Sequence, residues 1–450
     1  MIHSIIQKSQ LEGALRLDAE YYQPEYFIDF TKGDWRPIGD VLELCQYGLS
    51  QAMNDEKKGY PIFKMDNIDY SFLFEDDVRF ADIPKSTFDQ FEIKKDDVFF
   101  NRVNSEEFVG RTGIYKLDNL KSVFASYLIR VRVKSRGEIL ADYLNIFLNS
   151  SYGLRQIRKY TRRAVNQANV NAEELKQMRI AVLPINFQKE IAKVSNESWK
   201  SFENSKSLYQ QAENLLLEEL GMKNFESEGE LWNVVKLSEV KNANRIDAEY
   251  FASKCEKIFS KMKNQNVKKL DDLVTIKKGI EPGAESYQEE GKLFIRVSSL
   301  SKNGVIDKDQ KYLRDDLYQK LKEDFEPKEE EILLTKDATP GTAYVLKEPI
   351  QGIISGGILR LRTKENVNAE YLTLCINSII GQSQVERDAG GSIIKHWKPE
   401  QVKNLQVPIL PKSTQQKIAD LVRQSHEARK KAKQLLEEAK QKVEDLIENK

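Results

Sequence analysis

Cysteine and histidine are scarce in this sequence, with three of each in 450 residues. The cysteines, Cys45, Cys255 and Cys375, lie far apart and show no metal-type spacing. We therefore expect reduced thiols and a cytoplasmic protein rather than a disulfide framework. The histidines are equally dispersed, which excludes a histidine-rich metal centre.

Long apolar runs and the common catalytic motifs are also missing. No stretch approaches the roughly 20 apolar residues of a membrane helix, and the N-terminus has no basic region followed by an apolar one. The sequence has no phosphate-binding loop, HExxH zinc motif, GxSxG nucleophile elbow or glycine-rich adenosylmethionine loop. It also lacks the Asn-Pro-Pro-aromatic motif that holds a flipped base. We expect no membrane span, no secretory signal and no catalytic site, metal or cofactor on this chain.

Neither sign of charge dominates. The 70 Lys and Arg residues balance 70 Asp and Glu residues, so the formal net charge is zero. This balance excludes a uniformly basic surface for nucleic acid, because phosphate contacts depend on positive charge. The positions of the basic residues are therefore more informative than their total.

The chain contains an internal duplication. Four segments of the first half return in the same order in the second half, at offsets between 227 and 234 residues. They are RLDAEYY at 16–22 and RIDAEYF at 245–251, FEIK at 91–94 and FEPK at 325–328, ADYL at 141–144 and AEYL at 369–372, and the Leu-Pro turns at 183–184 and 410–411. The kept order predicts a tandem duplication of about 225 residues, with insertions in loops. The stretches 46–90 and 276–324 differ, as expected for two sites of one kind that read different things, with neutral drift after duplication as the alternative.

Each copy has the pattern of an α+β domain followed by a long helix. Short β-branched and aromatic runs bounded by Gly, Asp or Asn predict an irregular sheet that presents loops. A helix is expected around 141–160 and again around 369–387. We predict a first domain at 1–185, a spacer helix at 186–221, a second domain at 222–412 and a C-terminal spacer helix at 413–450.

Apolar and small residues alternate at spacings of three and four along both long helices. The first seam is Ile191, Val194, Ser198, Ser201, Ser205, Leu208, Ala212 and Leu215. The second is Ile418, Leu421, Ser425, Ala428, Ala432, Leu435, Ala439, Val443 and Leu446. Such stripes predict two antiparallel coiled-coil helices, a rod of about 45 Å with a domain at either end and pseudo-twofold symmetry. Alternatively, each stripe packs on its own domain.

Clusters of basic and amide side chains are candidates for contacts with DNA. Arginine and lysine contact phosphates or guanine, and asparagine and glutamine pair with adenine. The candidates come from the loop after residue 100, the basic stretch 155–163 with the polar residues behind it, and the matching parts of the second copy. They are Arg102, Asn104, Ser105, Arg111, Arg155, Arg158, Lys159, Arg162, Arg163, Asn166, Gln167, Asn169, Lys277, Lys278, Lys336, Thr339, Ser392, Lys395 and His396. An ordinary solvated surface is the alternative, and His396 is as well explained by packing.

A second set of cations alternates with apolar residues along a predicted strand. A period of two places these side chains on one face. They are Arg130, Arg132, Lys134 and Arg136, with Arg360, Arg362 and Lys364 in the second copy. Because both copies have the stripe, we interpret it as a surface for the DNA backbone, with a solvated sheet face as the alternative.

One short motif imitates a metal-dependent nuclease. Glu92-x-Lys94 is repeated as Glu326-x-Lys328, with acidic residues upstream. The triplet precedes its strand, and Pro327 inside the second copy disfavours a central strand. We predict a turn at both places.

The two-copy plan, the NRVNSEEFVG block at 101–110 and the repeated Leu-Pro…Gln…Ile junction into a long helix resemble the specificity subunit of type I restriction–modification enzymes. The resemblance covers essentially the whole chain. It implies two target-recognition domains, each reading one half of a bipartite, asymmetric site in double-stranded DNA. It implies that the helices set the spacing and dock two methyltransferase subunits.

The resemblance further implies a non-catalytic chain, with adenosylmethionine and ATP bound by partner subunits and restriction subunits completing the complex. With zero net charge, the isolated chain is expected to bind DNA weakly and in a salt-sensitive way. Two alternatives remain for the function: a subunit that itself cleaves DNA, through Glu92 or Glu326, and a protein-only scaffold of another defence system.

Overall fold

The computed structural model divides into two compact units. Unit 1 comprises Met1–Glu203 and Ala428–Lys450, and unit 2 comprises Asn204–Glu427. The structure describes residues 5–8, 11, 16–118, 120–164, 167–223, 225, 233–263, 265–306, 310–364, 367–390 and 394–449. Within these ranges no helix is both long and apolar enough to cross a membrane.

Unit 1 is built on a six-stranded sheet with the order β2-β11-β7-β9-β5-β4, and three smaller sheets have the orders β10-β3-β6, β12-β13-β8 and β1-β14. Its strands are β1 (Trp35–Pro37), β2 (Leu42–Tyr47), β3 (Tyr60–Phe63), β4 (Ile68–Asp69), β5 (Phe72–Leu73), β6 (Arg79–Ala81), β7 (Val98–Asn101), β8 (Val103–Asn104), β9 (Thr112–Ile114), β10 (Val123–Phe124), β11 (Leu128–Val133), β12 (Arg162–Ala164), β13 (Gln167–Asn169) and β14 (Arg179–Ala181). Its helices are α1 (Ile38–Val41), α2 (Lys85–Phe91), α3 (Ala141–Leu148), α4 (Ser151–Tyr160) and α5 (Ala172–Gln177).

Unit 2 has four-stranded sheets of order β16-β26-β22-β24 and β17-β21-β18-β25, and the pairs β15-β28, β19-β20 and β23-β27. Its strands are β15 (Val267–Lys269), β16 (Val274–Lys278), β17 (Tyr287–Gln288), β18 (Lys292–Ile295), β19 (Leu300–Ser301), β20 (Gly304–Val305), β21 (Lys311–Leu313), β22 (Ile332–Thr335), β23 (Asp337–Ala338), β24 (Ala343–Val345), β25 (Gly352–Ile354), β26 (Ile358–Thr363), β27 (Lys395–His396) and β28 (Gln406–Pro408). Its helices are α7 (Leu237–Ala243), α8 (Ser253–Met262), α9 (Leu270–Leu273), α10 (Asp315–Phe325), α11 (Ala369–Asn377), α12 (Ile379–Asp388) and α13 (Pro399–Lys403).

The two units repeat one topology. The order β2-β11-β7-β9 in unit 1 matches β16-β26-β22-β24 in unit 2, with antiparallel neighbours in both. The parallel pair β10 and β3 likewise matches β25 and β18. The predicted fold class, two tandem α+β domains with long helices, is confirmed.

Each helix predicted after the main sheet is in fact two helices. The hydroxyl of Ser150 accepts a hydrogen bond from Gly153 N and caps α4, while the hydroxyl of Ser378 accepts from Ile380 N and caps α12. A Cβ at Gly153 would lie 2.3 Å from the carbonyl oxygen of Phe147, so only glycine allows the chain to turn this tightly. The prediction of single helices around 141–160 and 369–387 was therefore wrong.

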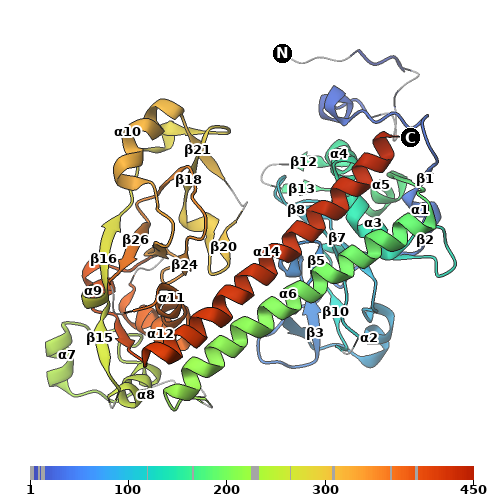
Figure 1. Ribbon diagram of the computed structural model, residues 1–450. Helices are drawn as coiled ribbons and strands as arrows, with labels where there is room; N and C mark the ends of the chain where they lie inside the picture. Colours follow the sequence, from blue (N-terminus) through green and yellow to red (C-terminus); the bar gives the residue numbers. More distant parts are fainter. Residues whose placement is uncertain are drawn as a thin grey trace. The chain divides into compact units, whose positions relative to one another are not determined.

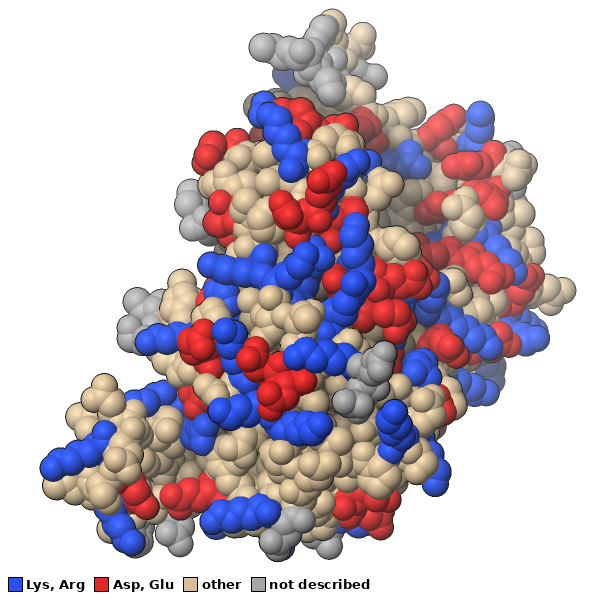
Figure 2. Space-filling model, turned by 60° about the vertical axis from the view of Figure 1, so that its left-hand side comes forward, with Lys and Arg blue, Asp and Glu red and all other residues tan. Residues whose placement is uncertain are grey.

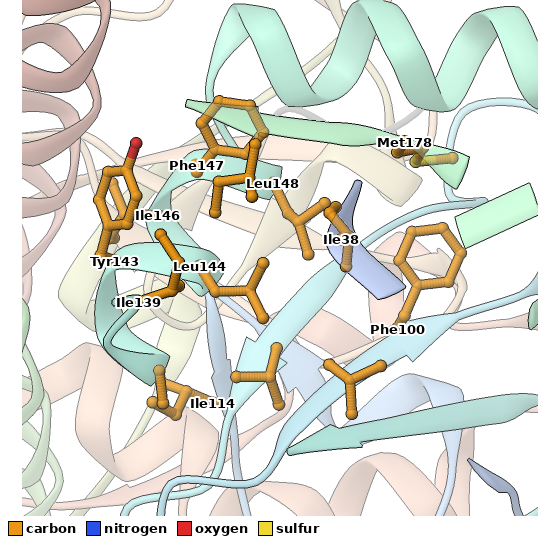
Figure 3. Packing of buried hydrophobic residues seen from close by; sticks show 14 of the residues in the cluster. Ile38, Phe100, Ile114, Ile139, Tyr143, Leu144, Ile146, Phe147, Leu148 and Met178 are labelled. Carbon is orange, nitrogen blue, oxygen red and sulfur yellow. The ribbon is translucent and has the colours of Figure 1, made fainter. Parts of the chain in front are cut away.

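The main core of unit 1 lies between its six-stranded sheet and the helices that cover it. Figure 3 shows Phe100 and Ile114 of the sheet facing Tyr143, Leu144 and Phe147 of α3, with Ile38 and Met178 closing one side. Residues of the long helix α14 (Lys412–Glu448) complete the same cluster, among them Leu436 and Val443. The unit therefore folds around a sheet, its own helices and part of a long helix.

The long helices α6 (Ile185–Glu219) and α14 pack side by side and antiparallel (Figure 1). In unit 1, Lys442 Nζ donates to Glu190 Oε1 (2.7 Å) and Ser198 Oγ donates to the Ala432 carbonyl oxygen (2.8 Å). In unit 2, Ser425 Oγ donates to the carbonyl oxygen of Ser205 at 2.7 Å. The antiparallel pairing predicted from the seams is thus present.

The buried stripes are wider than the predicted seams. Ile191, Ser198 and Ser205 are buried as predicted, but Phe202 is fully buried where the seam had Ser201. Phe202 lies 5.9 Å from the ring of Phe72 in the main sheet. The predicted a/d seam was partly wrong because each helix packs against its own domain as well as against the other helix.

Candidate nucleic-acid interface

In unit 1, the small sheet β12-β13-β8 collects candidate residues from distant parts of the chain. Arg162 pairs with Asn169 and Arg163 with Ala168, while Ala168 pairs with Asn104 across the other edge. Gln167 is exposed on the central strand. Two arginines and three amides therefore share one sheet of three short strands, the donor set that phosphates and base edges require.

The loop between β8 and β9 binds two arginines, Arg163 of β12 and Arg158 of α4. Arg163 donates from Nε and Nη2 to Glu106 Oε1 at 2.8 and 2.6 Å, and Arg158 Nη1 donates to the carbonyl oxygen of Glu106. The Arg163 hydrogen bond holds the pKa of Glu106 below its usual range. Arg162 Nε donates to Glu174 Oε1 at 2.6 Å, yet 60% of its side chain is exposed. These guanidinium groups are therefore positioned before any ligand is bound.

Aromatic rings contact the three remaining candidate arginines of unit 1, Arg102, Arg111 and Arg155. The Arg102 guanidinium lies 4.9 Å from the ring centroid of Tyr47 and donates to the carbonyl oxygen of Ser126 at 2.9 Å. Arg111 lies 3.9 Å over Phe108, and Arg155 lies 4.8 Å over Tyr152. The other two candidates are bound locally. Lys159 lies 4.7 Å from the ring of Tyr21, and Ser105 N donates to Asn104 Oδ1 at 2.8 Å.

In unit 2, the strand pair β23-β27 corresponds to the small sheet β12-β13-β8 of unit 1. Asp337 pairs with His396 and Ala338 with Lys395. Asp337 accepts from Lys336 Nζ at 2.5 Å and lies 2.8 Å from His396 Nδ1. Burial opposes ionisation, but these two partners outweigh it and lower the pKa of Asp337.

The other candidates of unit 2 lie in different places. Thr339 is exposed in the following turn, where its carbonyl oxygen accepts from Thr335 Oγ1. Lys277 and Lys278 lie on β16, the edge strand of another sheet, and are not brought to β23 and β27. Asn166 and Ser392 fall outside the described residues.

Backbone hydrogen bonds show that the two edges are equivalent. Val170 N donates to the Arg102 carbonyl oxygen at 3.0 Å, and Trp397 N donates to that of Lys336 at 2.8 Å. The loops close alike, since Gly110 N donates to Asn101 O and Gly341 N to Thr335 O. One backbone frame therefore carries arginines and amides in unit 1, and an Asp–His–Lys group in unit 2.

The predicted cation stripe is not exposed along its whole length, although Lys134, Arg136, Arg362 and Lys364 are exposed. Arg130 is 2% exposed and donates to the Glu92 carbonyl oxygen, while Arg132 binds both oxygens of Asp97 at 2.6 and 2.8 Å. In unit 2, Arg360 is 4% exposed and donates to Glu331 at 2.8 Å. This interpretation was wrong for Arg130, Arg132 and Arg360, because the distant carboxylates of Asp97 and Glu331 neutralise them inside the fold.

The nuclease-like triplets form turns, as predicted. Lys94 N donates to Asp97 Oδ2 at 2.8 Å, and Lys328 N donates to Glu331 Oε2 at 2.9 Å. Throughout the described ranges, no group of three or more His, Cys, Asp or Glu side chains could hold a metal ion. In each unit this turn places a carboxylate beside a buried arginine: Asp97 beside Arg130, and Glu331 beside Arg360.

Sequence reasoning missed Glu106 as the partner of the interface arginines, and it missed two tyrosines beside Arg102. Tyr47 and Tyr127 are 41% and 48% exposed, and the Tyr127 carbonyl oxygen accepts from Arg102 N at 3.0 Å. No local signal identifies Tyr47, since the fold alone brings it to this edge. On the face drawn in Figure 2, basic and acidic side chains are interspersed, in line with the zero net charge.

Comparison with known proteins places this chain in a family. The family model of the type I restriction modification DNA specificity domain matches twice, at residues 33–214 and 262–441. A Methanocaldococcus jannaschii protein named as a type I restriction enzyme specificity subunit is 26% identical over 471 residues, covering 95% of this chain and 97% of the relative.

Two solved structures align with most of the chain. The S subunit of a type I restriction–modification system from M. genitalium has 13% identity and a TM-score of 0.40, over 94% of this chain and 97% of that one. The HsdS subunit from Thermoanaerobacter tengcongensis has 14% identity and a TM-score of 0.29, over 92% and 96%. With the specificity domain matched in both halves, the chain belongs to the family of type I restriction–modification specificity subunits.

Proposed function

We propose that this chain reads a bipartite DNA site, with unit 1 recognising one half and unit 2 the other. The observation that carries the proposal is the repeated backbone frame with different side chains. The edge β12-β13-β8 presents Arg162, Gln167 and Asn169, whereas the edge β23-β27 presents Lys395 and His396. Equivalent positions with unlike donors are what two unlike half-sites require.

In this proposal the chain supplies specificity and assembly, and its partners supply the chemistry. Two methyltransferase subunits bind along it and carry adenosylmethionine, while restriction subunits carry ATP. The paired helices α6 and α14 set the separation of the half-sites. Because the net charge is zero, the isolated chain binds DNA weakly and loses that binding as salt rises.

The test is to co-express the chain with its cognate methyltransferase in a host without DNA methylation and to map the modified adenines. A single bipartite motif is expected. Gln167→Ala should relax one base position in one half-site only, because an amide that pairs with adenine discriminates by about 1–3 kcal/mol. Gln177→Ala is the matched control, since Gln177 is equally exposed in the same unit but lies on α5.

The second half-site has its own pair of variants. Lys395→Ala should alter only the half-site that Gln167→Ala leaves unchanged, and Lys403→Ala on α13 serves as its control. A motif unaffected by Gln167→Ala and Lys395→Ala would contradict the assignment of these edges. If reversing the charge of Arg162 and Arg163 left methylation intact, the protein-only scaffold would be the better explanation.

A further inference from the structure

Exposed aromatic side chains are few in this protein. Among the described residues they are Phe27, Tyr47 and Tyr127. Single exposed apolar residues are ordinary on a protein surface, so their position decides what they mean. Tyr127 lies in the turn between β10 and β11, and Tyr47 ends β2, so the fold brings two of the three rings together from distant parts of the chain.

The turn that carries Tyr127 is tightly held. Leu128 N donates to the carbonyl oxygen of Ala125 at 2.9 Å, which closes the turn. A Cβ at Gly48 would lie 2.2 Å from the same carbonyl oxygen, so only glycine lets the chain pass this closely after β2. The backbone of Tyr127 therefore has a fixed position before any ligand is bound.

Backbone hydrogen bonds join this turn to the small sheet β12-β13-β8. Arg102, which directly precedes β8, donates from its N to the carbonyl oxygen of Tyr127 at 3.0 Å. Its own carbonyl oxygen accepts from Val170 N, directly after β13, also at 3.0 Å. Tyr127 thus lies next to the strands that carry the candidate amides.

The side chain of Arg102 is fixed at the same place. Its guanidinium lies 4.9 Å from the ring centroid of Tyr47, and its Nε donates to the carbonyl oxygen of Ser126 at 2.9 Å. The hydroxyl of Tyr47 accepts from Ala172 N at 2.9 Å, which anchors that ring in turn. An exposed apolar ring and a positioned guanidinium therefore stand side by side along the backbone at this edge.

Unit 2 has the same turn without the ring. Lys336 N donates to the carbonyl oxygen of Gly357 at 2.9 Å, so Gly357 takes the place of Tyr127. A Cβ at Gly357 would lie 2.7 Å from Cγ2 of Val297, which is closer than ordinary contact allows. The aromatic side chain is therefore a property of unit 1 alone, at a position where the shared frame differs between the units.

The chemistry of duplex DNA limits what such a ring can contact. Base pairs show only their edges in the grooves, and the apolar group on these edges is the C5 methyl of thymine in the major groove. Inserting a side chain between base pairs is the other possibility, but it requires costly unstacking. Because Tyr127 is 48% exposed, unit 1 already covers about half of it, which favours contact with a base edge over insertion.

We propose that Tyr127 is a specificity-determining residue, whose ring contacts the C5 methyl of a thymine in the half-site read by unit 1. This inference rests on the proposed function, which assigns the neighbouring sheet to DNA. The position then requires thymine, because the other three bases present no methyl group in the major groove. The half-site read by unit 2 has no such contact, since Gly357 offers no side chain.

The experiment measures the affinity of the full chain, bound to its cognate methyltransferase, for duplexes that carry the mapped bipartite motif. Deoxyuridine replaces each thymine in turn, which removes only the methyl group. Fluorescence anisotropy gives the Kd of each duplex, and Gln167→Ala identifies the half-site of unit 1. At one thymine of that half-site the Kd should rise about fourfold, the effect of one buried methyl group.

Variants of Tyr127 show whether its ring is the partner of that methyl. Tyr127→Ser should bind the thymine duplex at least about fourfold more weakly and lose nothing further at the same deoxyuridine. Tyr127→Phe keeps the ring and should keep the preference for thymine. Ile185→Ser is the control, since Ile185 is an exposed apolar residue of the same unit on α6, and it should bind like the unaltered chain. All three variants should melt with the unaltered chain, because the changed side chains are exposed.

Two results would overturn the inference and leave the proposed function intact. If Tyr127→Ser kept the full sensitivity to deoxyuridine, another residue would contact the methyl. If Tyr127→Ser weakened binding equally for every duplex while thymine and deoxyuridine behaved alike in the unaltered complex, the ring would stack on a base or contact the sugar–phosphate backbone. By contrast, an unaltered complex that methylates no bipartite motif would refute the proposed function, and the inference with it.

Discussion

Arg130 and Arg360 hold equivalent positions in the two units, and each lies beside a buried carboxylate. Asp97 is fully buried next to Arg130 and Arg132, and Glu331 is 5% exposed next to Arg360. Burial of a cation without a counter-charge is costly, so each carboxylate stabilises its domain by its position. These groups belong to the scaffold that the two units share.

Removing one of these carboxylates should be strongly destabilising. Asp97→Asn leaves two arginines without their counter-charge and is expected to lower the free energy of unfolding by about 3 kcal/mol. Glu331→Gln should do the same in unit 2. The control is Asp118→Asn, which breaks an exposed pair with Lys95 and should be close to neutral. Urea unfolding of the full chain measures all three, and equal midpoints for Asp97→Asn and Asp118→Asn would refute the argument.

Two equivalent ion pairs, Arg16 with Asp18 and Arg245 with Asp247, predict a specific pH dependence. Hydrogen bonds from Arg16 and Arg245 lower the pKa values of Asp18 and Asp247 below their usual range. A carboxylate whose folded pKa is lowered stabilises the fold above its unfolded pKa of about 3.9, and this contribution is lost as pH falls through the folded pKa. The difference in Tm between the unaltered chain and Asp18→Asn should therefore be constant from about pH 5 to 8 and shrink below about pH 4. A difference that grows on acidification would exclude the Arg16–Asp18 ion pair as its source.

At the scale of elements, two equivalent serines join the long helices. Ser198 donates to the carbonyl oxygen of Ala432 in unit 1, and Ser425 donates to that of Ser205 in unit 2, at 2.8 and 2.7 Å. The positions 198 and 425, and likewise 205 and 432, are related by the same offset of 227. Small residues therefore allow close approach of the helices at matching points in the two copies.

Two substitutions at Ser198 measure separately the hydrogen bond of its hydroxyl and the close approach of the two long helices. Ser198→Ala should cost about 1 kcal/mol, the net value of one buried hydrogen bond. Ser198→Leu should cost more, at about 1–3 kcal/mol beyond that, because the added side chain has no space between the helices. Ser207→Ala, in the exposed part of α6, is the control and should be close to neutral. Thermal unfolding measures the order of stability of these variants. Equal stability of Ser198→Leu and Ser198→Ala would contradict the close approach of the helices at this position.

At the scale of the whole molecule, α6 and α14 each contribute residues to both units. The helices contain 35 and 37 residues, and 35 residues correspond to about 52 Å of helix. Leu436 and Val443 of α14 belong to the core of unit 1. Leu216 of α6 and Ile418 of α14 belong to the core of unit 2. A change in helix length therefore affects both units together.

Deleting one heptad from both helices tests the proposed spacing role. Seven residues span about 10 Å, which matches about three base pairs of B-DNA. The methylation motif should keep both half-sites and lose about three unspecified base pairs between them. Deletion from α6 alone is the control, because it breaks the matched pairing and should abolish methylation. A motif of unchanged length after the double deletion would exclude the helices as the ruler.

The sequence by itself was sufficient for the duplication, the fold class, the two long helices and the family. These properties depend on comparing the chain with itself and on local periodicity, which need no knowledge of distant contacts. The N-caps that split the helices at Ser150 and Ser378 are also local signals. They were missed because the apolar pattern continues across both serines.

Only the tertiary structure decided which cations are exposed. Arg130 and Arg163 both lie in basic stretches of the sequence, so the sequence does not distinguish them. In the fold, Arg130 is buried against Asp97, whereas Arg163 pairs with Glu106 at the small sheet β12-β13-β8. The width of the helix stripes was decided in the same way, by the contact of Phe202 with the main sheet. These outcomes depend on residues far apart along the chain that only folding brings together, so periodicity cannot encode them.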